Sequence, residues 1–386
     1  MTNATEIRRP FQSDRPIRIG MVGAGFMARL HSSAYLLLRP AMGGHVPAVE
    51  LMRISDEVPE RAAAAAARFG WRESCPDWRD ITRSADIDLV DVVTPNDAHK
   101  EVVLDAAAQG KAIVCEKPLA PTLEHAVEMV EAVERACVPT CVCLVYRMWP
   151  AVQLARLLIA RGDLGSVHSY RGYFLQDYAL DPSMPFTWRF DRNRAGAGSI
   201  GDIGSHAIDL AEFLLDDEIV SVFAVTRTII SERPADETIG ARPVRVEVDD
   251  EADLLIKFAA GPQGVIQTSW ISTGTKTDWG FEIRGRKGAI TFSWSRANEL
   301  RLYLASDPAE TQGFKTIVLG PQHPNAEYFW PLPGLNIGYQ EAFVITLGHF
   351  LSGDGDAPTF REGQRATAVI DAALRSAESG TWKNVA

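Results

Sequence analysis

The sequence predicts an α/β protein in two parts: an N-terminal doubly wound parallel sheet and a C-terminal α+β domain with a large, open, mostly antiparallel sheet. Up to about residue 147, short β-rich runs alternate with helical stretches of ten or more residues. From residue 166 onward, long β-rich runs follow one another with short polar turns. The chain has 386 residues, too many for one ordinary domain. We therefore expect domains over residues 1–147 and 148–386, with the C-terminal helices free to pack back on the first.

In the N-terminal part, the apolar pattern predicts each strand and helix in turn. Strands are expected over residues 17–22, 49–54, 86–93, 111–115 and 140–145. Helices are expected over about 26–38, 57–69, 97–109 and 122–136. Gly70 and Gly110 end the second and third helices. The first crossover is expected to be longer than usual, and it contains Pro40, Gly43 and Pro47.

The C-terminal part has one early helix, several strands and two late helices. The helix is predicted over residues 200–215, and the late helices over 337–351 and 361–379. The strands are predicted over 220–230, 244–260, 264–272, 281–286 and 289–294. No low-complexity linker separates the two parts, so we expect them to pack tightly together.

Charge and composition exclude several classes of protein. Lys and Arg total 39 against 50 Asp and Glu, a formal net charge of −11. A sequence-independent nucleic-acid binder needs a basic surface, so nucleic acid is not an expected partner. No run of about 18 apolar residues is present, and no membrane-spanning helix or membrane partner is expected.

The cysteines and the N-terminus predict a cytoplasmic protein. None of the five cysteines has CxxC spacing, which favours buried thiols in a reducing compartment; they are Cys75, Cys115, Cys137, Cys141 and Cys143. The run Arg8-Arg9-Pro10-Phe11 is part of a twin-arginine export pattern, but no apolar stretch follows it. We therefore expect no export signal there.

A glycine-rich turn predicts a dinucleotide site. Gly23-x-Gly25-x-x-Ala28 follows the first strand and opens a helix, so a pyrophosphate would lie against the helix N-terminal amides. Phe26 and Met27 of this turn are further candidate contacts. Asp56 ends the second strand, where a carboxylate binds ribose hydroxyls and repels a 2′-phosphate, so NAD is favoured over NADP. The alternative is a glycine-rich turn that binds no cofactor.

Two more candidate segments end neighbouring strands. Thr94-Pro95-Asn96 follows the strand over residues 86–93, with His99 one helical turn further on, and Glu116-Lys117-Pro118 follows the strand over 111–115. In open parallel sheets, ligands bind beyond the carboxyl ends of the strands. The proline disfavours the α conformation at Lys117 and permits a cis bond, so this lysine is held at a fixed turn. The alternative for Lys117 is a solvated charge.

Asp202 and His206 form a candidate acid–base pair. Their i, i+4 spacing places both side chains on one face of the predicted helix. A carboxylate beside an imidazole orients it and raises its pKa, as a general base near neutrality requires. The alternative is an Asp that complements the helix dipole and a buried structural His. The preceding Gly196-Ala197-Gly198-Ser199 lets the backbone approach a ligand closely, which favours function.

Taken together, the motifs resemble those of the glucose–fructose oxidoreductase/inositol dehydrogenase/rhizopine-catabolism (Gfo/Idh/MocA) family over almost the whole chain. The motifs, in order, are Gly23-Ala24-Gly25-Phe26-Met27-Ala28, Thr94-Pro95-Asn96-x-x-His99, Glu116-Lys117-Pro118, Tyr146-Arg147-x-x-Pro150, Trp188-Arg189 and Gly201-Asp202-Ile203-Gly204-Ser205-His206-x-x-Asp209. The resemblance implies an N-terminal Rossmann domain and a C-terminal sheet that forms homodimers or homotetramers. It also implies NAD(P)-dependent oxidation or reduction of a sugar or cyclitol.

The resemblance assigns roles to individual residues. It implies that Lys117, Asp202 and His206 are catalytic. Trp188 and Arg189 would lie near the cofactor, with Arg147 at the Rossmann edge of the site. The full cofactor set is then Gly23, Gly25, Phe26, Met27, Asp56, Thr94, Pro95, Asn96, His99, Glu116, Lys117, Arg147, Trp188 and Arg189. Val145 stands where many members carry Asn, so a polar contact is not expected there.

An aromatic segment adds candidate substrate contacts. Residues 170–190 hold seven aromatic residues, which would stack on sugar rings or, more commonly, pack in the core and the oligomer sheet. Gln176 and Asp177 add hydrogen-bonding groups that suit a polyol, and Tyr339 opens a late helix as a further candidate. Together, Gln176-Asp177-Tyr178 and Trp188-Arg189-Phe190-Asp191 resemble the levoglucosan dehydrogenase and inositol dehydrogenase-like branch of the family, whose members act on pyranose or cyclitol rings.

The expected reaction is hydride transfer from a secondary hydroxyl of a pyranose or cyclitol to NAD. His206 would take the hydroxyl proton, and Lys117 would stabilise the alkoxide or relay the proton; the two roles are exchangeable on this reasoning. Asp202 would orient His206 or bind a neighbouring substrate hydroxyl. No metal ligand spacing is found. Two alternatives stay open: an NAD-dependent glycoside hydrolase that works by transient C3 oxidation and elimination, and a non-enzymatic dinucleotide-binding regulator.

Overall fold

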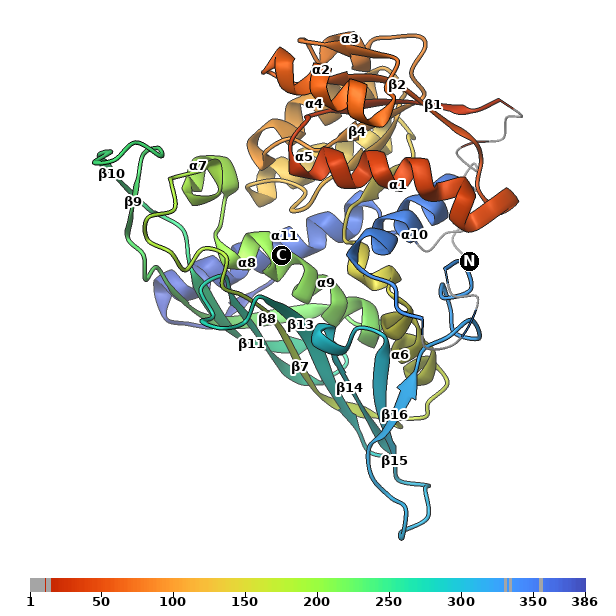
Figure 1. Cartoon of the computed structure of the whole chain (residues 1–386). Coiled ribbons are helices and arrows are strands. Elements are labelled where there is room, and N and C mark those ends of the chain that lie inside the picture. The colour runs from red at the N-terminus through yellow and green to blue at the C-terminus, as the bar shows by residue number, and fades with distance from the viewer. Residues whose placement is uncertain (1–10, 12–14, 330–331, 333–334, 354–356) are drawn as a thin grey trace.

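The structure is a computed structural model that describes residues 11, 15–329, 332, 335–353 and 357–386. Arg8 and Arg9 of the export-like motif lie outside these residues. The chain forms a parallel sheet and a large second sheet, and Figure 1 places helices α9, α10 and α11 between them. Over the described residues, no helix is both long and apolar enough to cross a membrane.

The N-terminal sheet has six parallel strands in the order β3-β2-β1-β4-β5-β6. The strands are β1 (Ile17–Val22), β2 (Val49–Ser55), β3 (Glu73–Cys75), β4 (Leu89–Val92), β5 (Ala112–Cys115) and β6 (Thr140–Val142). The helices are α1 (Phe26–Met42), α2 (Pro59–Phe69), α3 (Arg79–Thr82), α4 (Asn96–Ala108) and α5 (Leu123–Arg135). The strand order reverses between β1 and β4, which is where such sheets bind ligands. The predicted doubly wound sheet is confirmed.

The second sheet has nine strands in the order β16-β15-β14-β13-β7-β12-β11-β8-β17. They are β7 (Val167–Gln176), β8 (Ile219–Arg227), β11 (Glu251–Phe258), β12 (Gln263–Ser269), β13 (Thr277–Gly285), β14 (Gly288–Ser293), β15 (Glu299–Leu304), β16 (Lys315–Val318) and β17 (Lys383–Asn384). All neighbours pair antiparallel except β12 and β7. The predicted large, mostly antiparallel sheet is confirmed. A separate hairpin pairs β9 (Glu232–Pro234) with β10 (Pro243–Arg245).

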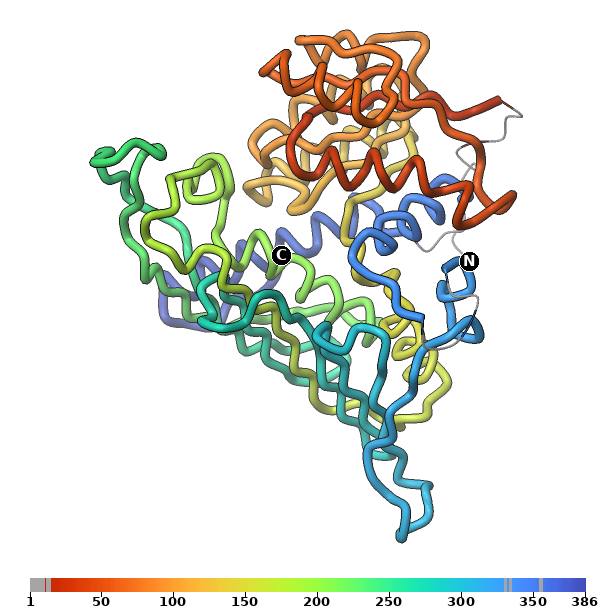
Figure 2. Tube along the Cα trace, viewed as in Figure 1, coloured from red at the N-terminus to blue at the C-terminus, as the bar shows by residue number. Residues whose placement is uncertain are grey.

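Helices α6 (Pro150–Ala160), α8 (Ser199–Asp202), α9 (Gly204–Leu215) and α11 (Phe360–Ser379) pack on one face of the second sheet. The short helix α7 (Arg192–Ala195) instead contacts α4, and α10 (Tyr339–Ser352) contacts α1. Along β11, buried and exposed residues alternate, as a sheet with one covered face requires. The turn between β15 and β16 projects away from the rest of the molecule (Figure 2).

The late helices also reach the parallel sheet. The Gln340 side chain on α10 donates to the Leu30 carbonyl of α1 at 2.8 Å. The Val142 amide of β6 donates to the Pro358 carbonyl just before α11 at 2.9 Å. Because both helices touch elements of the first 147 residues, the two sheets form one packed body.

Several predicted boundaries are wrong. Helix α1 continues through Pro40 to Met42, beyond its predicted end near residue 38, and a short 3₁₀ turn over Gly43–His45 follows it. The strand predicted over 140–145 stops at Val142, where a 3₁₀ helix over Val145–Met148 follows. The strand predicted over 244–260 is two strands, β10 and β11. The buried Asp249 and Asp250 separate them, because their carboxylates accept backbone N–H groups of neighbouring segments.

The helix predicted over 200–215 is interrupted at Ile203 and forms α8 and α9. At the break, the Asp202 carbonyl accepts a hydrogen bond from the Lys117 ammonium group at 2.7 Å. The sequence also gave no prediction for α6 or for strands β7, β15 and β16. Strand β7 was not predicted because its aromatic residues were interpreted as stacking or packing groups. Aromatic residues also favour strands.

Candidate active site

A cavity of about 400 Å³ lies where the carboxyl ends of the parallel strands meet the second sheet. Its lining includes most of the residues predicted from the sequence. From the N-terminal part these are Phe26, Met27, Thr94, Asn96, Glu116 and Lys117, and from the C-terminal part Gln176, Trp188, Arg189, Asp202, His206 and Tyr339. The two halves of the chain therefore contribute to one site.

Lys117 and Asp202 join the two halves at the cavity. The Lys117 ammonium group donates to the Asp202 carboxylate at 2.9 Å and to the Asp202 carbonyl at 2.7 Å. Their side chains are 15% and 21% exposed, so the pair is shielded yet open to a ligand. Burial alone would raise the pKa of Asp202, but the charges of Lys117 and Arg189 lower it to about 2. Asp202 is therefore an anion at neutral pH.

Two further groups approach the other carboxylate oxygen of Asp202. The Tyr178 hydroxyl donates to it at 3.4 Å, and the Arg189 guanidinium lies 3.8 Å away. Arg189 also stacks over the Trp188 ring, with 4.5 Å between the guanidinium carbon and the ring centre. Asp202 thus organises the cationic and hydroxyl groups of this wall of the cavity.

His206 is a buried neutral base. It is 6% exposed, and its ring packs 4.6 Å from the ring centre of Tyr146. Burial lowers its pKa well below the usual value, and the Lys117 charge lowers it further. The Asp202 charge raises the pKa, but by less than the other two effects lower it. The predicted rise in the His206 pKa is therefore wrong, because burial and the Lys117 charge together outweigh the Asp202 carboxylate. Its Nδ1 atom is buried and finds no hydrogen-bond partner among the described residues.

The glycine-rich turn fits a dinucleotide. Gly23 has φ +107°, and a Cβ there would lie 2.9 Å from the Val93 carbonyl oxygen, so only glycine suits this position. A Cβ on Gly25 would meet nothing within 4 Å, which leaves space beside the backbone. The residue that caps α1 is Gly25, which has no side chain to occupy the first amides of the helix, so they can donate to a phosphate.

Asp56 lies beside this turn. Its carboxylate accepts the Ala24 amide at 2.8 Å and the Val58 amide at 2.9 Å. These bonds fix the carboxylate at the end of β2, where a ribose would lie. Thr94 faces the main cavity, and its hydroxyl is buried without a partner among the described residues, as a group awaiting a ligand would be.

Some predicted residues do not line the main cavity. Gly23, Gly25, Asp56 and Pro95 lie in the turns beside it, and three others make protein contacts instead. His99 is fully buried between the carbonyls of Thr94 and Leu119. Arg147 forms a buried ion pair with Asp209. Asp177 pairs with Lys276 at 2.9 Å.

Sequence reasoning gave no site role to several residues that the structure places in the cavity. These are Cys143, Tyr146, Phe174, Tyr178, Met184, Thr187, Ile203 and Phe343. Tyr146 adjoins Arg147 in a recognised motif, and Phe174 and Tyr178 belong to the aromatic segment, so pattern alone could have suggested them. Cys143, Met184 and Phe343 have the sequence context of ordinary core residues, so no pattern could have identified them as part of the site.

Sequence reasoning also missed a buried polar cluster behind the cavity. Asp91 is fully buried in β4, and its carboxylate lies 2.9 Å from His31 Nδ1. The other ring nitrogen of His31 lies 3.0 Å from Glu116. His31, Glu116 and Cys143 also offer ligand atoms within 4.8 Å of one another, where the sequence indicated no metal site. The sequence did contain one indication of this cluster, because Asp91 is an acidic residue inside the otherwise mostly apolar run Ile87-Asp88-Leu89-Val90-Asp91-Val92-Val93.

Comparison with known proteins identifies the same two parts. Residues 17–143 match the oxidoreductase family with an NAD-binding Rossmann fold, and residues 152–291 match the GFO/IDH/MocA C-terminal domain. The chain is 39% identical to levoglucosan dehydrogenase of Pseudarthrobacter phenanthrenivorans, covering 96% of this chain and 98% of that protein. It is 28% identical to inositol 2-dehydrogenase of Rhizobium meliloti, covering 93% and 96% of the two chains.

A solved structure extends this likeness to three dimensions. The complex of levoglucosan dehydrogenase with NADH and levoglucosan superposes with a TM-score of 0.92 at 39% identity. The match covers 96% of this chain and all of the other (100%).

Proposed function

This chain belongs to the GFO/IDH/MocA family of NAD-binding oxidoreductases, and we propose that it transfers hydride between NAD and a secondary hydroxyl of a pyranose sugar or cyclitol. One observation carries the proposal: an ammonium group, Lys117, and a neutral imidazole, His206, line the same cavity beside a dinucleotide turn. An alcohol oxidation needs a proton acceptor and a group that stabilises the alkoxide, and these two residues supply both.

Each protein group has a distinct task. NAD, when bound, supplies the hydride acceptor at its nicotinamide ring. His206 accepts the hydroxyl proton because its ring is neutral at physiological pH. Lys117 donates a hydrogen bond to the substrate oxygen as negative charge develops there. Asp202, an anion, holds the Lys117 ammonium group in place. The alcohol carbon loses its C–H electron pair with the departing hydride, the O–H electron pair becomes the second bond of the C=O group, and the O–H proton ends on His206.

The substrate end of the cavity suits a ring with several hydroxyls. Gln176, Tyr178 and Arg189 provide hydrogen-bonding groups, and the aromatic rings of Trp188 and Tyr339 provide faces for the C–H side of a sugar. A relative at 39% identity is named levoglucosan dehydrogenase, and a similar structure is described with NADH and levoglucosan. We therefore infer that an anhydro-pyranose of the levoglucosan type is the first substrate to test.

We further propose that residues 1–147 hold NAD and residues 148–386 supply the substrate wall and the oligomer interface. On the outer face of the large sheet, the apolar side chains of Val225, Leu255 and Val265 are 51%, 47% and 37% exposed. Adjacent exposed apolar residues on a sheet favour association with a second copy. A homodimer or homotetramer joined through this face would cover them. The five cysteines are all free, which supports a reducing, cytoplasmic setting.

A panel of sugars tests the reaction. The enzyme is mixed with NAD and with levoglucosan, other pyranoses, cyclitols or aryl glycosides, and both NADH absorbance and aglycone release are followed. The proposal predicts NADH accumulation with at least one pyranose or cyclitol. Aglycone release without NADH accumulation would identify a glycoside hydrolase instead. Tight NAD binding with neither signal would favour a regulator.

A further inference from the structure

A chain of charged groups runs from the interior of the parallel sheet to the catalytic lysine. Asp91 lies in the middle strand β4, and the Tyr35 hydroxyl donates to it at 2.9 Å. The His31 ring lies between Asp91 and Glu116, with contacts of 2.9 Å and 3.0 Å. The second oxygen of Glu116 accepts the backbone amide of Lys117 at 3.1 Å. This series of contacts reaches the backbone of Lys117, whereas Asp202 binds its ammonium group.

The contacts of His31 favour its protonated form. Both ring nitrogens lie within hydrogen-bond distance of a carboxylate, and a positively charged imidazolium can donate from both nitrogens at once, whereas a neutral ring donates from only one. Burial alone would lower the pKa of His31, but the Asp91 carboxylate raises it well above the usual value. The same charge is what allows two acidic groups, Asp91 and Glu116, to stay buried at 0% and 4% exposure.

Every element packed around His31 supports this arrangement. Tyr35 faces it from the same helix, Asp91 from β4, Glu116 from the end of β5 and Cys143 from the segment after β6. The Phe343 ring of α10 covers it, with ring centres 5.3 Å apart. Burial raises the pKa of the Cys143 thiol well above its usual value, so Cys143 is uncharged. The enclosed pair of carboxylates therefore has one cationic neighbour, His31, among these groups.

We propose that His31 and Asp91 are positioning residues for catalysis: the His31 imidazolium fixes the Glu116 carboxylate, which in turn holds the Lys117 backbone so that its ammonium group reaches the reacting oxygen. This inference rests on the proposed function, because it assigns to these groups the placement of its alkoxide-stabilising residue. Glu116 also lines the cavity, so its orientation shapes the floor on which the reactants lie. Small displacements of a catalytic group are costly, about 100-fold for 1 Å.

Kinetics with matched variants test the positioning role. His31→Gln and Asp91→Asn should lower kcat about 10- to 100-fold, with KM for the sugar changed less than threefold. Ser32→Ala is the control: Ser32 is buried next to His31 on α1 and accepts the Trp71 indole N–H, and within the described part of the chain it hydrogen-bonds to neither carboxylate. It should keep kcat within about twofold. Equal losses in all three variants would show general destabilisation and overturn the proposal.

The pH profile separates positioning from packing. In Asp91→Asn, His31 keeps only the Glu116 carboxylate as an anionic neighbour, so the pKa of His31 falls toward neutrality. The pH profile of kcat should then show an additional ionisation that the wild type lacks. A residue with a merely structural role would lower kcat by the same factor at every pH. An unchanged profile shape in Asp91→Asn would contradict the proposal.

A measurement without a sugar distinguishes this inference from the proposed function. In protein labelled with ¹⁵N at histidine, the ring signals of His31 are identified by their loss in His31→Gln. Both nitrogens should remain protonated at pH 7, above the usual imidazole pKa of about 6.5. A neutral His31 ring at pH 7, or a stoichiometric metal ion held by His31, Glu116 and Cys143, would overturn the inference. If no sugar is oxidised by the wild type, the proposed function fails, and this titration alone decides the state of the network.

Discussion

At the scale of single residues, neighbours that the sequence does not place together set the chemistry of the site. The sequence pairs Asp202 with His206, yet the folded chain pairs Asp202 with Lys117, which lies 85 positions earlier. The partnership of Lys117 and Asp202 depends on how the two sheets face one another, and local spacing contains no information about that. The residue types were predictable, but their contacts and the direction of the His206 pKa shift were not.

His206 leads to a prediction about pH. Because its pKa is lowered well below its usual value of about 6.5, the ring is neutral at and below neutrality until that lowered pKa is reached. The acid limb of kcat/KM should therefore lie below about pH 6.5. His206→Gln should lower kcat about 100-fold or more and remove this limb. Steady-state rates between about pH 4.5 and pH 8 provide the measurement.

The matched control for His206 is His45→Gln, since His45 is exposed in a short turn after α1. Its profile should coincide with that of the wild type. An acid limb centred above pH 7 in the wild type, or one that persists in His206→Gln, would contradict a neutral His206 base.

At the scale of elements, the strands and helices with a regular apolar period were predictable. The parallel sheet follows from short buried strands such as β4 and β5, whose residues are all buried. The break between α8 and α9 was not predictable. At the break the Asp202 carbonyl accepts the Lys117 ammonium group, and Asp249, 47 positions beyond Asp202, accepts the amides of Gly198 and Ile200 at the start of α8. Long-range capping of this kind leaves no local pattern.

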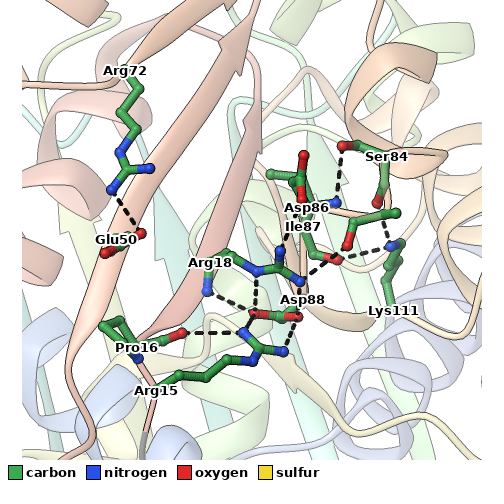
Figure 3. Close-up of polar contacts among 11 residues, drawn as sticks. Arg15, Pro16, Arg18, Glu50, Arg72, Ser84, Asp86, Ile87, Asp88 and Lys111 are labelled. Carbon is green, nitrogen blue, oxygen red and sulfur yellow. Dashed lines mark hydrogen bonds and ion pairs between the residues drawn. The ribbon is translucent and has the colours of Figure 1, made fainter.

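A second polar cluster stabilises the opposite edge of the parallel sheet, at the start of its strands. Figure 3 shows Arg15 and Arg18 converging on the Asp88 carboxylate, with contacts as short as 2.6 Å and 2.9 Å. In the same view, Lys111 donates to the carbonyls of Ser84 and Ile87. These contacts tie the start of β1 to the turns before β4 and β5.

Asp88 leads to a prediction about stability. Arg15 and Arg18 hold its pKa well below the usual range despite burial, so folding favours the ionised form. Asp88→Asn should lower the free energy of unfolding by about 1–2 kcal/mol at pH 7, measured by urea denaturation. For a carboxyl whose folded pKa is depressed, this contribution is complete above the unfolded pKa of about 3.9 and is lost as pH falls toward the folded value.

The control is Asp86→Asn, because the Asp86 side chain is 75% exposed and makes a single ion pair with Arg18. It should change the free energy of unfolding by less than about 0.5 kcal/mol. If Asp88→Asn costs the same at about pH 3 as at pH 7, the Asp88 carboxylate does not stabilise the fold through its charge.

At the scale of the whole molecule, the open face of the large sheet predicts an oligomer. Leu255→Lys introduces a charge among the exposed apolar residues of β11, β8 and β12. Sedimentation velocity should show a homodimer or homotetramer for the wild type and a smaller species for this variant. Leu36→Lys is the control, because Leu36 is similarly exposed (52%) but lies on α1 and not on the large sheet.

The oligomer proposal has two contrary outcomes. A monomeric wild type would refute association directly. An unchanged size for Leu255→Lys, with correct folding by circular dichroism, would place the interface elsewhere.

The division of the molecule was predictable, because a change from alternating strands and helices to successive strands is visible along the chain. The closeness of the two parts was only partly predictable. Contacts such as that of Gln340 on α10 with α1 link residues 310 positions apart. The cavity exists only because of such long-range packing. Gln176 of β7 and Tyr339 of α10 were predicted as contacts, but their neighbours Phe174 and Phe343 were not.

Lys117→Ala most directly tests the central claim, that Lys117 stabilises the reacting oxygen in an NAD-dependent hydride transfer. The initial rate of NADH formation is measured with the best sugar of the panel, and NADH affinity is measured by fluorescence titration. The account predicts a rate at least about 100-fold below the wild type, with the Kd for NADH within about threefold. Lys100→Ala, whose lysine pairs with Glu128 at 3.0 Å between α4 and α5, should match the wild type. Turnover of Lys117→Ala within about twofold of the wild type would contradict the account.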